Sequence, residues 1–243
     1  RGSDPAPLAL EQFIICLQNH DQVGNRAFGD RLHDRIDAAS YRAASALLLC
    51  APETPLLFMG QEWAASSPFR FFTDHTEEIG GRITDGRREE FAGFFAFRDP
   101  AARSGIPDPQ DPRTFADSRL RWNEITGEDH QRIVRLYRAL LAFRRTNPAM
   151  LSRERTSVTV VALDPDTIAL WRHPADWPPV ALIAHLSTQP ASVRIPGHWQ
   201  TVLTTEDRNF ATDGRLPVFQ ADDRGIDIRF ARAGAVLLRA DST

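Results

Sequence analysis

The sequence has 243 residues, with 29 Lys and Arg against 32 Asp and Glu and a net charge of −3. A chain of this length can bury a sizeable core, and 42% hydrophobic and 25% charged residues are typical of soluble globular proteins. The slightly acidic balance argues against a nucleic-acid interface, which needs a basic face. Its apolar runs are too short to span a bilayer, so we expect neither a nucleic-acid nor a membrane partner.

All the basic residues are arginines. Lysine chemistry, such as Schiff-base formation, is therefore excluded within this chain. The two cysteines, Cys16 and Cys50, stand in apolar stretches without metal-ligand spacing. We expect both to be buried and reduced, as is typical of a cytoplasmic protein.

The first part of the chain predicts two buried strands joined by a helix. Apolar runs at 13–17 and 56–60 fit strands of a parallel sheet, and the stretch 38–51, rich in Ala and Leu and followed by prolines, fits the helix. Ligands of such βαβ units bind at the carboxyl ends of the strands. Polar clusters follow both strands there, so the sequence predicts a site at those ends.

Residues 64–127 show little periodicity and are rich in Pro, Gly, Asp and aromatic residues. So long a loop region is usually functional. A strong helical pattern then covers Glu128–Thr146, with Thr126 and Asp129 as an approximate capping box. Tyr137 and Phe143 lie in this helix and are expected in the core.

After about residue 153 the chain becomes a series of short β-rich runs. Several alternate apolar and polar residues, and Pro, Gly and Asp separate them at the spacing of a β-sandwich. We expect a domain boundary near Leu151, with an α/β domain at 1–150 and an antiparallel β-sandwich at 151–243. The predicted strands cover 158–163, 168–172, 180–186, 192–195, 201–203, 226–230 and 235–239.

Asn19, His20 and Asp21 follow the first predicted strand directly. Cleavage of a glycosidic bond passes through an oxocarbenium-like transition state, which carboxylates beside the sugar ring stabilise. A neutral histidine next to the carboxylate can hydrogen-bond sugar hydroxyls. The same residues fit a turn or a helix cap at least as well, so spacing alone leaves both interpretations open.

In their context these residues resemble the seventh-strand motif of the α-amylase superfamily, whose fold is a (β/α)8 TIM barrel, and residues 56–62 resemble its eighth strand. The resemblance implies the C-terminal part of such a barrel followed by the β-sandwich. Within the superfamily, an ordered series of motifs is similar to malto-oligosyltrehalose trehalohydrolases: Gln22-Val23-Gly24-Asn25-Arg26, Leu57-Phe58-Met59-Gly60, Phe72-Thr73-Asp74-His75, Gly86-Arg87-Arg88-Glu89-Glu90-Phe91 and Pro107-Asp108-Pro109-Gln110-Asp111-Pro112.

The resemblance implies a retaining glycosidase that cleaves the α-1,4 bond next to the terminal trehalose unit of maltooligosyl trehalose. It makes Asp21 the transition-state stabiliser and His20 its partner in sugar binding, with Asn19 and Gln22 as further substrate contacts. The family's nucleophilic Asp and acid/base Glu lie on the fourth and fifth strands, for which this chain has no match. The implied partner is the missing N-terminal part of the same enzyme, and the fragment alone is expected to be inactive.

Other polar residues are candidates by position alone. Glu62 could line the mouth of the site or form a structural ion pair, while Gln61 stands where many relatives carry an acid and has no expected catalytic role. Asp74 and His75 are candidate sugar contacts. Arg26 could bridge carboxylates beneath the site or pair on a surface loop, and we expect the surface pair. A cluster of aromatic residues fits a sugar platform less well than a core: Trp63, Phe69, Phe71 and Phe72.

The seven histidines are dispersed without metal-ligand spacing, so we expect neither a metal nor a cofactor. Three alternatives remain open. A glucan branching enzyme shares the superfamily, although the continuation after Asp21 favours the hydrolase. The β-rich tail and the missing carboxylates also fit a non-catalytic carbohydrate-binding module, or a truncated chain whose two orphan βα units expose apolar faces.

Overall fold

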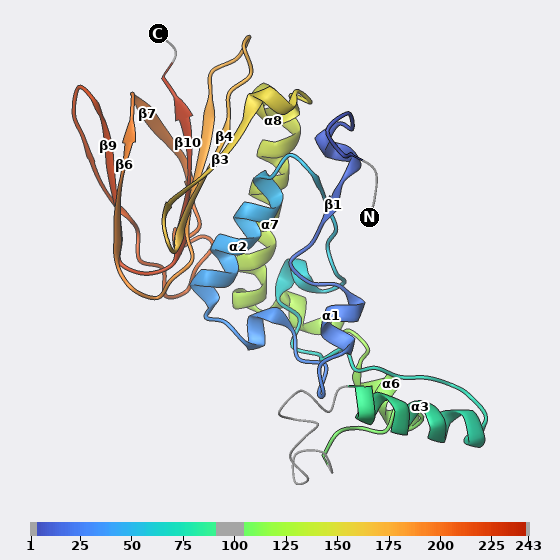
Figure 1. Ribbon diagram of the computed structural model, residues 1–243. Coiled ribbons are helices and arrows are strands. Elements are labelled where there is room, and N and C mark those ends of the chain that lie inside the picture. Colours follow the sequence, from blue (N-terminus) through green and yellow to red (C-terminus); the bar gives the residue numbers. More distant parts are fainter. Residues whose placement is uncertain (1–3, 91–104, 242–243) are drawn as a thin grey trace.

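The computed structural model describes residues 4–90 and 105–241. Phe91, the last residue of one predicted motif, and the part of the long loop region that follows it lie outside these residues. Figure 1 shows helices α2 (Ala38–Cys50) and α7 (Glu128–Thr146) side by side in the middle, with β-sheets on one side and strand β1 (Ile14–Ile15) on the other. Within the described ranges, no helix combines the length and the apolar character needed to cross a bilayer.

The predicted βαβ unit is present, with shorter strands than expected. Strands β1 (Ile14–Ile15) and β2 (Thr54–Pro55) pair in parallel, and the second lies two residues before its predicted start. The Leu56 amide still donates to the Ile15 carbonyl at 2.8 Å. Each strand has one partner among the described residues, so the apolar residues beyond that ladder have no second strand to pair with, and Ile14 is 68% exposed.

Helix α2 (Ala38–Cys50) confirms the predicted helix. The Asp37 carboxylate begins it by accepting hydrogen bonds from the Ala39 and Ser40 amides, both at 3.0 Å. The helix is buried on several sides because it packs against α7 and against two strands of the C-terminal sheet. This fits its Ala-rich sequence, which has no wide polar face.

Helix α7 (Glu128–Thr146) has the predicted bounds, and the four-residue helix α8 (Pro148–Leu151) follows it. Tyr137 is buried and Phe143 packs against the same core, as predicted. The predicted capping box is wrong. Thr126 belongs to a preceding 3-10 helix and donates to the Asn123 carbonyl, while Asp129 accepts a hydrogen bond from Thr212, so neither side chain caps α7.

The long loop region contains elements that its sequence does not suggest. Helix α3 (Glu77–Glu90) is polar almost throughout, with ion pairs such as Glu78–Arg82 on its surface. Figure 1 shows α3 and α6 (Pro112–Asp117) standing away from the rest of the molecule. The described residues also contain five 3-10 helices: Leu10–Gln12, Leu32–Asp34, Gln61–Trp63, Trp122–Thr126 and Arg155–Ser157.

The C-terminal part forms two antiparallel sheets. One has the strand order β3-β4-β5-β10-β7 and the other β6-β9-β8. All seven predicted strands are present, whereas β8 was not predicted because its four residues are exposed and carry no alternating pattern. The strands are β3 (Val158–Asp164), β4 (Thr167–Arg172), β5 (Val180–His185), β6 (Ala191–Pro196), β7 (Trp199–Thr204), β8 (Val218–Ala221), β9 (Gly225–Phe230) and β10 (Gly234–Ala240).

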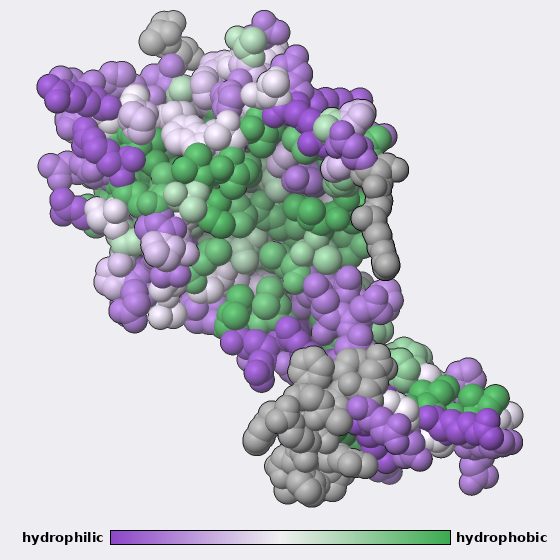
Figure 2. Space-filling model, in the orientation of Figure 1, coloured by the Kyte–Doolittle hydropathy of each residue, from purple (hydrophilic) through white to green (hydrophobic). Residues whose placement is uncertain are grey.

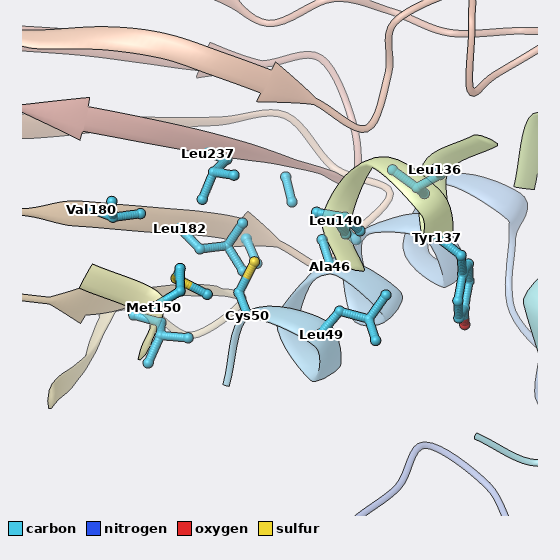
Figure 3. Packing of buried hydrophobic residues seen from close by; sticks show 14 of the residues in the cluster. Ala46, Leu49, Cys50, Leu136, Tyr137, Leu140, Met150, Val180, Leu182 and Leu237 are labelled. Atoms are coloured by element: carbon cyan, nitrogen blue, oxygen red, sulfur yellow. The ribbon is translucent and has the colours of Figure 1, made fainter. Parts of the chain in front are cut away.

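The larger sheet is the middle of three layers. Successive side chains of a strand point to opposite faces, and β5 is buried at every position. Val180 and Leu182 pack with the helices, as Figure 3 shows, whereas Ala181 and Ile183 pack with the smaller sheet. The helical core therefore continues across Leu151, and the division into domains at 1–150 and 151–243 stays a prediction from the sequence.

A buried ion pair joins the same two parts of the chain. Arg42 on α2 donates to both carboxylate oxygens of Glu206, which follows β7, at 2.9 and 2.8 Å. Both side chains are almost fully buried. Arg232 donates to Glu206 at 3.1 Å and to Asp213 at 2.7 Å, so two guanidinium groups share two carboxylates.

This cluster predicts a stability change in acid. The hydrogen bond from Arg232 holds the pKa of Asp213 below its ordinary value. The folded state is therefore stabilised above the unfolded-state pKa of about 3.9, and the stabilisation is lost as the pH falls through the lower pKa of the folded state. We expect the difference in melting temperature between wild type and Asp213→Asn to shrink as the pH is lowered from 6 to 2.5. A difference independent of pH would contradict it.

The cysteines follow the sequence prediction in part. Both are free thiols, and Cys50 is buried, where desolvation raises the pKa of its thiol to about 12. Cys16 is only half buried, because it follows the short strand β1, whose surroundings are open. Cys50 is therefore expected to be unreactive in the folded protein.

Candidate functional site

The candidate residues begin on a short helix directly after β1. Helix α1 spans His20–Gly24, and Asn19 precedes it as the N-cap, with its side-chain oxygen accepting the Gln22 amide at 2.8 Å. The helix-cap interpretation of the sequence therefore applies to Asn19 itself. Because the cap fixes where the helix begins, it also fixes the direction in which the next two side chains leave the chain.

His20 and Asp21 lie side by side at the surface. The His20 Nε2 atom is 3.2 Å from the Asp21 Oδ1 atom, and each side chain is 71% exposed. A pair exposed to this extent contributes little to folding stability. Both groups therefore keep hydrogen-bonding capacity for a ligand, which a buried structural pair would not have.

A hollow of about 230 Å³ lies beside this pair. His20, Asp21, Gly24 and Asn25 line it on the α1 side, and the segment from Phe69 to Phe72 lines the other. Gly29 brings the two sides together. It has φ +68°, and a Cβ atom there would meet the Phe69 backbone at 2.5 Å, so only glycine permits this approach.

The aromatic cluster divides between the two expected roles. Trp63 is buried in a small core with Ala65 and Val134, which is the structural alternative. Phe69 and Phe72 are half buried and contact one another edge to face, with their ring centroids 5.8 Å apart. Together with Phe71 they present apolar surface in the same hollow as the carboxylate, an arrangement on which the C–H faces of a sugar can pack.

The remaining candidates lie elsewhere among the described residues. Asp74 and His75 are exposed and follow Phe72 along the chain, but neither lines the hollow. Gln110 fixes the backbone there, accepting from the His75 amide at 3.3 Å and donating to its carbonyl at 2.8 Å. Glu62 is half buried in the 3-10 helix after β2 and does not line the hollow either.

Gln61 and Arg26 both make hydrogen bonds within the protein. Gln61 is fully buried, and its side-chain amide donates to the Tyr137 hydroxyl at 3.0 Å. The Tyr41 hydroxyl in turn donates to the Gln61 carbonyl at 2.7 Å, so this turn is fixed to both α2 and α7. Arg26 donates to the backbone and carboxylate of Asp30 on a partly exposed loop.

Arg31 is a residue that sequence reasoning missed. It is fully buried, and its guanidinium donates to the Ser67 carbonyl at 2.6 Å and to the Met59 carbonyl at 2.8 Å. Desolvation lowers its pKa, while nearby Tyr41 and several acidic groups, Glu62 among them, oppose the change. It joins the loops that follow the two strands. No spacing signal marks it, because both partners are backbone carbonyls distant in sequence.

The described residues contain no group of three or more His, Cys, Asp and Glu side chains that could hold a metal ion. No protein-family model matches the chain.

Comparison with solved structures finds a class of enzymes that the chain resembles. A crystal structure of a putative α-amylase from Salmonella typhimurium superposes with a TM-score of 0.73 and 28% identity, covering 96% of this chain and 36% of that one. An α-amylase from H. orenii has a TM-score of 0.56 at 15% identity, which shows the shared fold alone. The chain is therefore similar to α-amylase-family enzymes in sequence and in fold.

Curated sequences narrow the resemblance to one kind of enzyme. A malto-oligosyltrehalose trehalohydrolase of Deinococcus radiodurans is 48% identical over 161 residues, 65% of this chain and 26% of the relative. Relatives of the same name from Rhizobium sp. and Brevibacterium helvolum are 41% and 40% identical and cover 83% and 86% of the chain. The chain spans about a quarter to a third of the length of these relatives. Its predicted resemblance to malto-oligosyltrehalose trehalohydrolases is confirmed.

Proposed function

We propose that the chain is part of a retaining glycosidase that cleaves the α-1,4 bond next to the terminal trehalose unit of maltooligosyl trehalose and so releases trehalose. One observation carries the proposal most directly. An exposed histidine–carboxylate pair, His20 and Asp21, lies beside an aromatic-lined hollow immediately after a parallel strand. The similarity to enzymes named for this reaction supports the substrate.

Asp21 acts in this proposal as the transition-state stabiliser. Among the described residues, only His20 pairs with its carboxylate, so the exposed carboxylate can accept hydrogen bonds from sugar hydroxyls and oppose the positive charge that develops on the ring. His20 binds sugar beside it. Gln22 and Asn19 are proposed as further substrate contacts, since Gln22 is exposed on the same helix and Asn19 caps it.

Glu62, Asp74 and His75 are proposed as more distant substrate contacts. Glu62 follows the carboxyl end of β2. This strand pairs with β1, the strand that precedes Asp21. Asp74 and His75 are exposed and extend from the segment that lines the hollow. A long α-glucan reaches beyond one hollow of this size, so contacts on the adjoining loop are consistent with the substrate.

We propose further that the nucleophile and the acid/base residue lie on strands outside this chain. Unpaired strand edges among the described residues support this, because a closed barrel leaves no strand edge unpaired. Exposed apolar side chains, including Ile14, Leu56 and Met59, lie on or next to the two strands. Figure 2 shows apolar residues gathered across the middle of one face of the molecule. In this proposal the other strands of the (β/α)8 barrel lie beside β1 and β2, and this chain alone is inactive.

The test compares the complete enzyme with the chain described above. The complete enzyme is expected to release trehalose from maltooligosyl trehalose, and residues 1–243 alone are expected to release none. New α-1,6 branches on amylose without free trehalose would instead identify a branching enzyme. Saturable binding of maltoheptaose by a complete protein that hydrolyses neither substrate would identify a binding module.

A further inference from the structure

The five-residue helix α1 cannot hold its own orientation. Isolated helices this short are unstable in water, because few backbone hydrogen bonds offset the cost of ordering the chain. Asn19 fixes the beginning of the helix, and Val23 is its buried apolar side chain. The last turn needs its own attachment if His20 and Asp21 are to keep one position beside the hollow.

Arg87 supplies that attachment from α3. Its guanidinium donates to the Gly24 carbonyl at 2.6 Å, to the Arg26 carbonyl at 3.4 Å and to the Asn25 side-chain oxygen at 3.2 Å. The first of these bonds ends on the last residue of α1, where a positive charge also interacts favourably with the helix dipole. Arg87 is only 9% exposed.

The same guanidinium contacts the other side of the hollow. Its central carbon lies 4.6 Å from the centroid of the Phe71 ring, the distance of a cation–π contact. Gly24 and Asn25 on one side and Phe71 on the other all line the hollow. Arg87 therefore joins the two sides from behind while its own side chain is not among the lining residues.

Helix α3 packs in a way that favours a directional role. The buried positions in its middle are Gly80, Thr84 and Arg87, spaced to lie on one face. Apolar packing tolerates small shifts, whereas hydrogen bonds from a planar guanidinium fix both direction and distance. Arg88, the next residue, instead faces Asp85 at 3.6 Å in a partly exposed pair.

We propose that Arg87 is a positioning residue, which holds the Asp21 helix and the Phe71 segment at the separation that the reaction requires. This rests on the proposed function, in which Asp21 stabilises the transition state. Misplacing a reacting group by about 1 Å can cost on the order of a hundredfold in rate. Loss of the Arg87 contacts should therefore lower kcat, and the size of this effect should depend on whether Asp21 is present.

A double-mutant cycle in the complete enzyme tests this. Arg87→Ala is expected to lower kcat for trehalose release roughly 10- to 100-fold, with added guanidinium ion restoring part of it. In an Asp21→Asn background the same change is expected to cost less than about twofold, since the group it positions is already disabled. Arg88→Ala, on the same helix, is the matched control and should leave kcat unchanged.

Amide hydrogen exchange gives a readout that does not need activity. The Asn25 amide donates to the Asp21 carbonyl within α1, so its exchange reports the order of this helix. Arg87→Ala is expected to speed exchange there, while Arg88→Ala does not. Unchanged exchange, a kcat within twofold of wild type, or full additivity with Asp21→Asn would overturn the positioning role. Failure of the wild-type enzyme to release trehalose would refute the proposed function instead, and the exchange result would still decide the role of Arg87.

Discussion

Asp21→Asn is expected to lower kcat of the complete enzyme by roughly a thousandfold or more for trehalose release from maltooligosyl trehalose. The amide has the shape of the carboxylate but no charge, so it cannot oppose the positive charge of the transition state. Ground-state contacts to sugar hydroxyls survive in part, so KM should change far less than kcat. Because the side chain is 71% exposed, the melting temperature should be nearly unchanged.

Two further variants provide comparisons for Asp21→Asn. His20→Ala is expected to act mainly on KM, as loss of a sugar contact would. Asp85→Asn changes another exposed aspartate, on α3, and should alter neither kcat nor KM. Steady-state kinetics on purified enzyme would measure all three. Near-normal turnover of Asp21→Asn would show that Asp21 is a turn residue, the alternative that its position after a strand leaves open.

The elements predicted best are those whose pattern is local. Helix α7 and several of the strands follow from periodicity within one segment, because burial on one face leaves a repeat of its own in the sequence. Helix α2 follows from its Ala- and Leu-rich composition and from the prolines after it. Strand β5 shows what the pattern omits. Its continuous apolar run predicts burial on both faces, but the sequence does not say that α2 covers one of them.

The elements that were missed depend on contacts between distant residues. Helix α3 has no apolar stripe, because its buried face is held by polar groups such as Arg87. Arg31 is 36 residues from its partner Ser67, and nothing near it in sequence marks it as buried. Strands β1 and β2 are short for a different reason: among the described residues, each of them pairs with a single neighbouring strand.

The candidate site was predictable only on one side. The adjacency of His20 and Asp21 follows from the sequence itself, and the position of the pair after a strand follows from the apolar run. The aromatic side of the hollow depends on Gly29, whose positive φ lets the chain approach Phe69. A glycine in a loop is too common to predict such an approach, so the hollow required the three-dimensional structure.

Glu206→Ala is expected to destabilise the protein by about 3–5 kcal/mol, because it leaves the Arg42 guanidinium buried without its carboxylate. The two residues are 164 positions apart, one on α2 and the other just after β7. Loss of their ion pair therefore weakens the junction between α2 and the C-terminal sheet. The melting temperature should fall as well. Thermal and urea unfolding of the complete enzyme would measure both quantities.

Asp213→Ala is the matched control, since it removes a carboxylate of the same cluster that is 59% exposed. It should cost less than about 1 kcal/mol. The double variant Arg42→Met with Glu206→Leu removes both charges together, and it should recover most of the loss because no unpaired charge remains buried. Equal destabilisation by the single and the double variant would mean that packing volume, rather than the unpaired charge, determines the stability of this junction.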